Sequence, residues 1–309
     1  MRILLTGVGG QLGRELQPML AGRGELLATA RTSPAGVLEP AERLDLAEPG
    51  PLLALLDRWQ PQLIVNAAAY TAVDRAEQEA ELAMAVNARA PEMMAGWAAR
   101  HDCALLHFST DYVFDGRPGH PWRESDPVNP LNVYGASKLQ GEQAIRASAC
   151  RQLVLRSSWI YAAHGHNFVL KMLELARSGR ELSVVGDQLG SPTWAKNLAA
   201  CALQAIDRGH LRRPGEGATL YHWADRGAVS WFDFAERIFA HAVELGLLQN
   251  RPSMRKVDSR EFRQAARRPA WSVLDSSALQ ADLGIEPAGL ESSLLACLKE
   301  IKNNEQHHS

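Results

Sequence analysis

The sequence predicts an α/β fold in which a doubly wound parallel sheet is covered by helices on both faces. Three observations predict it. Short apolar runs alternate, from the first residues onward, with segments whose apolar side chains recur at helical spacing. The runs are apolar throughout, as in strands buried on both faces. A glycine-rich turn directly follows the first run, at the point where such sheets receive ligands.

The elements can be assigned in order along the chain. The expected strands are RILLT at 2–6, ELLATA at 25–30, PQLIVNAAA at 61–69, CALLHFST at 103–110 and RQLVLRSSWIY at 151–161. The expected helices are 10–22, 80–100 and 134–148 and, in the less regular second half, 167–179 and 230–246, with a short strand at 181–186. The polar end at 303–309 is expected to fray.

Composition excludes several kinds of partner. The net charge is -2, so no basic excess suggests nucleic acid or an anionic membrane. No apolar run approaches the ~20 residues that span a bilayer. The cysteines are scattered without metal-like spacing and are expected to be buried free thiols: Cys103, Cys150, Cys201 and Cys297. These features predict a soluble, cytoplasmic protein.

The turn after the first strand predicts a dinucleotide site. GVGGQLG carries Gly7, Gly10 and Gly13 between a strand and a helix. Glycines there allow a tight turn and a close approach to pyrophosphate, and the helix N-terminus, at Gln11 and Leu12, supplies amide donors. The alternative is a turn with a packing role only. In its strand–turn–helix context the motif favours a Rossmann-type sheet.

The residues that follow the next strands predict which dinucleotide binds. LLATARTS, at 26–33, has Arg31 and no acid, which favours the 2′-phosphate of NADPH, with NADH possible. The alternative is a solvated surface charge. Asp45, followed by Leu46, lies where it could meet the adenine edge or cap the next helix. Small residues end the third expected strand beside the cofactor: Ala67, Ala68 and Ala69.

Three motifs together resemble the extended short-chain dehydrogenases/reductases: the glycine turn, STDYVFDG at 109–116 and YGASKLQGE at 134–142. Within that superfamily, several further segments resemble the dTDP-4-dehydrorhamnose reductase family. They are GQLGREL at 10–16, NAAAYTAVDRAE at 66–77, VNARAP at 86–91, RSSWIYA at 156–162 and RRPAWSVLD at 267–275. The resemblance implies NADPH-dependent reduction of the 4-keto group of dTDP-4-dehydro-6-deoxy-L-mannose, which yields dTDP-L-rhamnose for cell-surface polysaccharides.

The resemblance also implies roles for a catalytic set. Tyr134 is the expected acid, Lys138 its partner one helical turn later, and Thr110 the third member. A phenol can protonate the alkoxide that hydride transfer leaves, a nearby lysine lowers the phenol's pKa and holds the ribose, and a hydroxyl polarises the carbonyl. Taken alone, Tyr134 and Lys138 could equally be a surface pair on a helix.

Substrate contacts are implied by the same resemblance. Thr110, Asp111 and Tyr112 are expected to border the sugar, and Trp159 to stack near it, unless Trp159 is core packing. Candidates for the nucleotide part are Asn167, Arg267 and Arg268. Paired arginines can instead form a solvated patch.

Some members of the family dimerise through a magnesium ion held by glutamates. Glu15 matches one ligand, but Lys196 stands at the presumed position of another. Because hard cations need oxygen ligands, we expect no magnesium, a Glu15–Lys196 salt bridge in its place, and a monomer or weak homodimer.

The expected organisation is an NADP(H)-binding domain at 1–160 and a mainly substrate-binding domain at 161–309, with the chain free to cross back. Two further functions stay open. One is another nucleotide-sugar ketoreductase, epimerase or dehydratase, although Tyr112 replaces the second acid that a dehydratase would need. The other is a non-catalytic NADP-binding subunit resembling the regulatory subunit of methionine adenosyltransferase.

Overall fold

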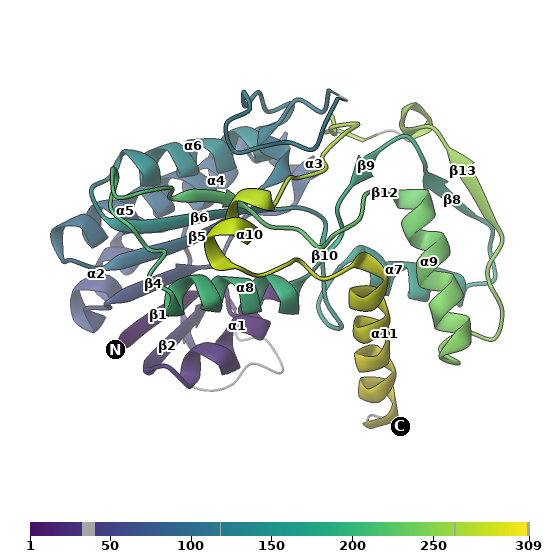
Figure 1. Cartoon of the computed structure of the whole chain (residues 1–309), viewed down its shortest axis with the longest axis horizontal. Coiled ribbons are helices and arrows are strands. Elements are labelled where there is room, and N and C mark those ends of the chain that lie inside the picture. The colour runs from purple at the N-terminus through teal and green to yellow at the C-terminus, as the bar shows by residue number, and fades with distance from the viewer. Residues whose placement is uncertain (33–40, 118, 263, 308–309) are drawn as a thin grey trace.

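A computed structural model describes residues 1–32, 41–117, 119–262 and 264–307 (Figure 1). Within them one seven-stranded parallel sheet has the order β11-β6-β5-β4-β1-β2-β3. The strands are β1 Arg2–Thr6, β2 Glu25–Ala30, β3 Ala41–Arg43, β4 Leu63–Asn66, β5 Ala104–Thr110, β6 Arg151–Ser157 and β11 Leu220–His222. The strand order reverses between β1 and β4, which is the doubly wound topology, so the predicted fold class is confirmed.

Helices cover both faces of this sheet (Figure 1). One face is packed by α1 (Gln11–Ala21), α8 (Ala195–Asp207) and α10 (Ser277–Leu283), whose leucines share a core with β1 and β5. The other face is packed by α2 (Pro49–Trp59), α5 (Ala90–Arg100) and α6 (Val133–Ala147). Shorter helical segments precede or follow these: α3 Val73–Ala76, α4 Ala80–Met84, a π-helical turn Ala85–Arg89 and a 3₁₀ turn Asp111–Val113.

A second core lies beside the sheet, on the right in Figure 1. It is formed by α7 (Phe168–Ala176), α9 (Trp231–Glu244) and α11 (Leu290–His307). Three strand pairs accompany it: β7 Ile160–Tyr161 with β10 Thr193–Trp194, β9 Leu189–Gly190 with β12 Val229–Ser230, and β8 Leu182–Val185 with β13 Met254–Val257. A 3₁₀ turn spans Ser259–Glu261.

The chain returns to the large sheet after entering the second core. Strand β11 pairs with β6, and Leu198 of α8 and Leu279 of α10 are buried in the core beneath β1. Residues beyond 160 therefore complete the first sheet as well as the second core. The domain limits at 1–160 and 161–309 stay a prediction.

Some local expectations differ from the structure. Strand β3 was not predicted, because three half-exposed residues carry no apolar run. The predicted helix 80–100 contains the π-helical turn, and the predicted strand 151–161 breaks after Ser157. Residues 303–307, which were expected to fray, continue helix α11, and residues 308 and 309 lie outside the described part of the chain. In the described part of the chain, none of the helices has the length and apolar character needed to cross a membrane.

Candidate active site

The glycine turn lies between the carboxyl ends of β1 and β4. Gly7 has φ +76°, and a Cβ there would lie 2.6 Å from the Cα of Ala68. A Cβ on Gly13 would lie 2.2 Å from the carbonyl oxygen of Gly7. Both positions therefore require glycine, Gly7 for its backbone conformation and for contact with the next strand end. Ala67, Ala68 and Ala69 are half-buried around this point.

The N-terminus of α1 opens at the same edge. Gly10 is its N-cap, and no described side chain caps it. The first amides of the helix, from Gln11 onward, can therefore serve an anion. The amide of Gly10 itself donates to the Gly7 carbonyl at 2.9 Å. The Gln11 side chain instead accepts from Asn167 Nδ2 at 2.9 Å, and Leu12 is buried in the core.

The predicted adenosine contacts lie at the ends of β2 and β3. Arg31 is exposed directly after β2, and Ser33 lies outside the described residues. The carboxylate of Asp45 accepts from the amide of Ala47 at 3.0 Å, which forms a turn ahead of α2. Leu46 is buried. Contacts of these residues with a cofactor stay predictions.

The three predicted catalytic residues lie at the carboxyl end of β5 and in the first turns of α6. Burial raises the pKa of Tyr134 to about 12, while a hydrogen bond with Thr110 lowers it and the charge of Asp111 raises it. The Thr110 hydroxyl donates to Asp111 Oδ1 at 2.9 Å. The structure therefore joins Thr110 and Tyr134, which the sequence separates by a long loop.

Helix α6 is held tightly against this strand end. Asn132 caps it by accepting from the Gly135 amide at 2.8 Å, and Asn132 Nδ2 donates to the Arg267 carbonyl. A Cβ on Gly135 would lie 2.2 Å from the Tyr112 carbonyl oxygen. The glycine after Tyr134 thus lets the helix begin directly beside Tyr112.

Lys138 is buried one turn further along α6. Its Nζ donates to the Phe108 carbonyl at 2.6 Å and lies 3.1 Å from His107 Nε2. Burial lowers the pKa of Lys138 to about 8, and Glu142 opposes that shift. Sequence reasoning missed His107, although a single histidine in the apolar run ALLHFST was a signal. The predicted effect of Lys138 on the pKa of Tyr134 stays a prediction.

Polar side chains lie at the carboxyl ends of β5 and β6, at the same edge of the sheet. Burial raises the pKa of Asp111 to about 6, while hydrogen bonds, first from Ser272 and then from Thr110, lower it. The hydroxyls of Ser109 and Ser157 are buried and have no hydrogen-bond partner among the described residues. Buried polar atoms are normally satisfied, so this edge is suited to a polar ligand. Tyr112 packs edge-on against Tyr134, with ring centroids 5.6 Å apart.

Trp159 has an unusual backbone, with φ +47°. Its half-exposed ring stacks on Trp231 with centroids 3.4 Å apart, and a Cβ on Gly190 would collide with it. The core-packing alternative therefore describes part of the ring, and the rest of it is exposed. A left-handed conformation in a bulky residue costs about 1–3 kcal/mol and is typical of functional sites.

The remaining predicted substrate residues have partners within the chain. The Asn167 amide caps α7 and donates to the Ala162 carbonyl, so it holds the strand–helix junction. Arg268 pairs with Asp74 at 2.7 Å, whereas Arg267 is exposed. Their contacts with a nucleotide stay predictions.

The expected Glu15–Lys196 salt bridge is wrong. Lys196 Nζ pairs with Glu300 at 2.9 Å, and Glu15 pairs with His164 at 2.8 Å. A lysine can reach Glu300 from the neighbouring helix, and the histidine is the nearer partner of Glu15. The described residues contain no group of three histidine, cysteine or acidic side chains that could hold a metal.

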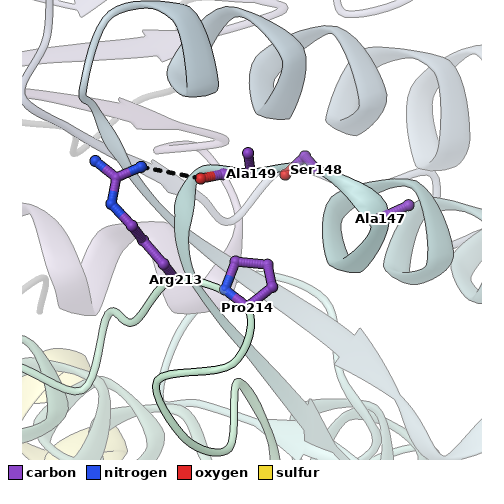
Figure 2. A pocket seen from close by; sticks show the side chains of 5 residues that line it. All are labelled: Ala147, Ser148, Ala149, Arg213 and Pro214. Carbon is purple, nitrogen blue, oxygen red and sulfur yellow. Dashed lines mark hydrogen bonds between the residues drawn. The ribbon is translucent and has the colours of Figure 1, made fainter.

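A separate hollow of about 330 Å³ lies away from this edge (Figure 2). It is lined by Ala147, Ser148, Ala149, Arg213 and Pro214. Figure 2 shows Arg213 donating to the Ala149 carbonyl, at 3.1 Å. These residues adjoin the start of β6, at the amino ends of the strands, whereas ligands of such sheets bind at the carboxyl ends.

The fold and the strand-end residues define a dehydrogenase/reductase of the Rossmann type. A Thermus thermophilus UDP-glucose 4-epimerase shares the fold, at 18% identity and a TM-score of 0.79. The family model described as "RmlD substrate binding domain" matches residues 1–303. The chain belongs to the dTDP-4-dehydrorhamnose reductase family.

Relatives match this chain over almost its whole length, and several of them are named dTDP-4-dehydrorhamnose reductase. A reductase of Aggregatibacter actinomycetemcomitans is 39% identical and covers 95% of this chain and 97% of its own. A Bacillus subtilis spore coat polysaccharide biosynthesis protein is 35% identical, covering 97% of both chains. The crystal structure of the reductase from Bacillus anthracis in complex with NADP has 31% identity and a TM-score of 0.85, covering 97% of this chain and 99% of that one.

Proposed function

We propose that this protein uses NADPH to reduce the 4-keto group of dTDP-4-dehydro-6-deoxy-L-mannose to dTDP-L-rhamnose. The observation that carries the proposal is the cluster of Thr110, Tyr134 and Lys138 beside the glycine turn. It occurs in a chain 39% identical to a protein named for this reaction. The NADP complex of the Bacillus anthracis relative supports the cofactor, and NADH is a possible substitute.

The residues present fit a dinucleotide. The uncapped α1 N-terminus suits a pyrophosphate, and the unpartnered hydroxyls of Ser109 and Ser157 suit polar ligand atoms. NADPH, when bound, supplies the hydride. Lys138 holds the ribose hydroxyls, and Arg31 pairs with the 2′-phosphate.

The proton and the carbonyl are handled by the protein. When substrate is bound, the Thr110 hydroxyl exchanges its hydrogen bond to Asp111 for one to the carbonyl oxygen and so orients it. Tyr134 gives its phenolic proton to that oxygen as the alkoxide forms. The high pKa of Tyr134 keeps the phenol protonated until then. The exposed part of Trp159 contacts the sugar, and Asp111 and Tyr112 border it.

The surroundings of the reaction belong to the same proposal. All four cysteines are free and buried, which confirms the predicted thiols and supports a reducing compartment such as the cytoplasm. The Lys196–Glu300 pair supports a monomer or weak homodimer without magnesium. The relative involved in spore coat polysaccharide synthesis supports a role in making a cell-surface sugar.

One assay tests the proposal: NADPH consumption with dTDP-4-dehydro-L-rhamnose, followed by identification of the product. We expect dTDP-L-rhamnose in equal amount to the NADPH consumed. NADPH binding without consumption would favour the regulatory-subunit alternative. Consumption only with a different nucleotide-sugar ketone would favour another ketoreductase.

A further inference from the structure

A buried row of polar side chains crosses three strands and ends at Lys138. His107 Nε2 lies 3.1 Å from Lys138 Nζ, and His107 Nδ1 lies 3.0 Å from Asn66 Nδ2. The Thr6 hydroxyl donates to Asn66 Oδ1 at 2.7 Å. Thr6 pairs with Asn66, and Asn66 with His107, at matching registers of β1, β4 and β5. No member of the row is more than 2% exposed.

The row is costly for a sheet interior. Its neighbours along the strands are apolar, including Leu5, Val65 and Leu106. Burying hydrogen-bonding groups stabilises a fold less than burying apolar groups of equal size, unless every group is paired. Packing the sheet therefore does not explain the row. Its two ends do, because Thr6 precedes the glycine turn at Gly7 and Lys138 lies in the catalytic cluster.

His107 can serve either charge state of Lys138. Burial, and then the charge of Lys138, hold the pKa of His107 well below its usual range, so the ring is neutral, with one donor and one acceptor nitrogen. Toward an ammonium, Nε2 accepts and Nδ1–H donates to the Asn66 amide oxygen. Toward an amine, Nε2–H donates and Nδ1 accepts from the Asn66 amide NH₂. A turn of that amide exchanges the two arrangements: the Thr6 hydroxyl donates to Asn66 Oδ1 in the second, as in this structure, and accepts from Asn66 Nδ2 in the first.

We propose that His107, oriented by Asn66 and Thr6, is a positioning residue that fixes the Lys138 nitrogen at the cofactor edge of the sheet. The inference rests on the proposed function, in which Lys138 holds the cofactor ribose. Phe108 anchors Lys138 through its carbonyl. The hydrogen bond to the Phe108 carbonyl alone would let the Lys138 nitrogen rotate about it. The contact with His107 is a second constraint that fixes the position of the nitrogen.

Two substitutions of His107 separate positioning from packing. His107→Gln places a polar amide near the position of Nε2 and keeps a partner for Lys138. His107→Asn places its amide near Nδ1 and keeps only the contact with Asn66. Each shortens or reshapes the same side chain and removes one hydrogen bond, so a merely structural histidine predicts equal effects on stability and on activity.

The measurements are kcat, KM and the Kd of NADPH from nucleotide fluorescence, with the thermal midpoint as the stability control. We expect His107→Asn to weaken NADPH binding and to lower kcat by about 10- to 100-fold, since misplaced catalytic groups have effects of that size. We expect His107→Gln to restore both to within about 3-fold, the contribution of one neutral hydrogen bond. Equal values for the two variants would overturn the proposal.

A second pair of variants keeps the proposal testable if neither His107 variant folds. Thr6→Val removes the far end of the row, and Thr29→Val is its matched control, since Thr29 is equally buried but donates only to the Leu5 carbonyl. We expect Thr6→Val alone to raise the Kd of NADPH, by about 3-fold. Equal Kd values overturn the positioning role. A wild type that binds NADPH but reduces no ketone overturns only the proposed function.

Discussion

Tyr134 is the acid in the proposed reaction. Its pKa, raised to about 12 by burial, leaves the phenol protonated at neutral pH, and Thr110 directs its hydroxyl. We predict that Tyr134→Phe lowers kcat by about 10²- to 10⁴-fold, because general acid catalysis contributes that much, and leaves the thermal midpoint unchanged. Steady-state NADPH oxidation measures it.

Tyr221→Phe is the control for that substitution. Tyr221 lies on the outer strand β11, away from the cluster, and its hydroxyl donates to Asp282 of α10. Removing that hydroxyl should therefore leave turnover intact. Near-normal turnover in a folded Tyr134→Phe variant would show that the proton comes from elsewhere.

Arg31, exposed at the end of β2, is the residue that we propose selects between the two dinucleotides. We predict that Arg31→Ala raises the KM for NADPH about tenfold or more, the effect of one charge-assisted contact to a phosphate, and leaves the KM for NADH unchanged. Arg58→Ala, which removes an exposed arginine paired with Glu42, controls for lost surface charge. A wild type with the lower KM for NADH would refute the role of Arg31.

At this scale the sequence predicted residues that belong to short motifs. Thr110, Tyr134 and Lys138 were identified from motifs that resemble those of the reductase family, and strand ends and helical spacing place such residues near one another. His107 was not, because its proposed role depends on Asn66 and Thr6, which lie in other strands. The left-handed backbone of Trp159 was not predictable either, since nothing in RSSWIYA requires it.

The glycine turn shows how an element depends on one position. We predict that Gly7→Ala destabilises the protein by about 2–4 kcal/mol, because φ +76° disfavours a side chain and the new Cβ would lie 2.6 Å from Ala68. Gly96→Ala, inside helix α5 with only the end of the Arg100 side chain within 4 Å, is expected to stabilise by about 0.5–1 kcal/mol. Urea unfolding measures both. An equal loss of stability in both variants would contradict this prediction.

The corner between β6, β11 and α6 makes stability depend on pH. Burial, and then Arg156, lower the pKa of His222 from 6.5 to about 3. Between pH 6.5 and pH 3, His222 is protonated in the unfolded chain and neutral in the folded protein. The contribution of neutral His222 to the free energy of unfolding is therefore fully present above pH 6.5. It falls by roughly 1.4 kcal/mol per pH unit as the pH drops toward 3.

Comparison with His222→Gln isolates that contribution. We predict that the difference in unfolding free energy between wild type and this variant shrinks steadily from pH 7 to pH 4 in urea titrations. Glu142, which pairs with Arg156, is present in both proteins, so its effect cancels. Parallel curves would show that His222 is protonated in the folded protein.

Among the elements, long apolar runs and amphipathic segments were predicted, and β3 was not. That strand is recruited by pairing with β2, since Ala28 to Ala30 lie opposite Ala41 to Arg43. The π-helical turn within 80–100 was also unpredicted. A Cβ on Gly141 would lie 2.1 Å from the Asn87 carbonyl oxygen, so the turn is fitted to a helix distant in sequence.

For the whole molecule, the pairing of Lys196 with Glu300 carries a prediction about assembly. The Lys196 ammonium neutralises the Glu300 carboxylate of α11, so this carboxylate needs no metal ion to balance its charge. We predict that EDTA leaves the sedimentation coefficient unchanged across protein concentrations. Mg²⁺ added to the EDTA-treated protein serves as the control and should likewise have no effect. A dimer that a chelator dissociates would contradict the prediction.

The global fold was predictable in class, because alternating buried strands and helices admit few other arrangements. The path of the second half was not, because LYH at 220–222 is too short to mark a sheet strand. Its place beside β6 is decided by tertiary packing of α8 and Trp223.

The late arrival of β11 has a consequence for synthesis on the ribosome. Chains emerge from their N-terminus, so the first six strands of the sheet are exposed while the residues that cover the outer edge of β6 are still unmade. Unpaired strand edges are sites of aggregation. The outer edge of β6 therefore stays unpaired on the nascent chain until about residue 223 has emerged. A nonsense mutation before that point leaves a fragment that is prone to aggregate rather than a smaller active protein.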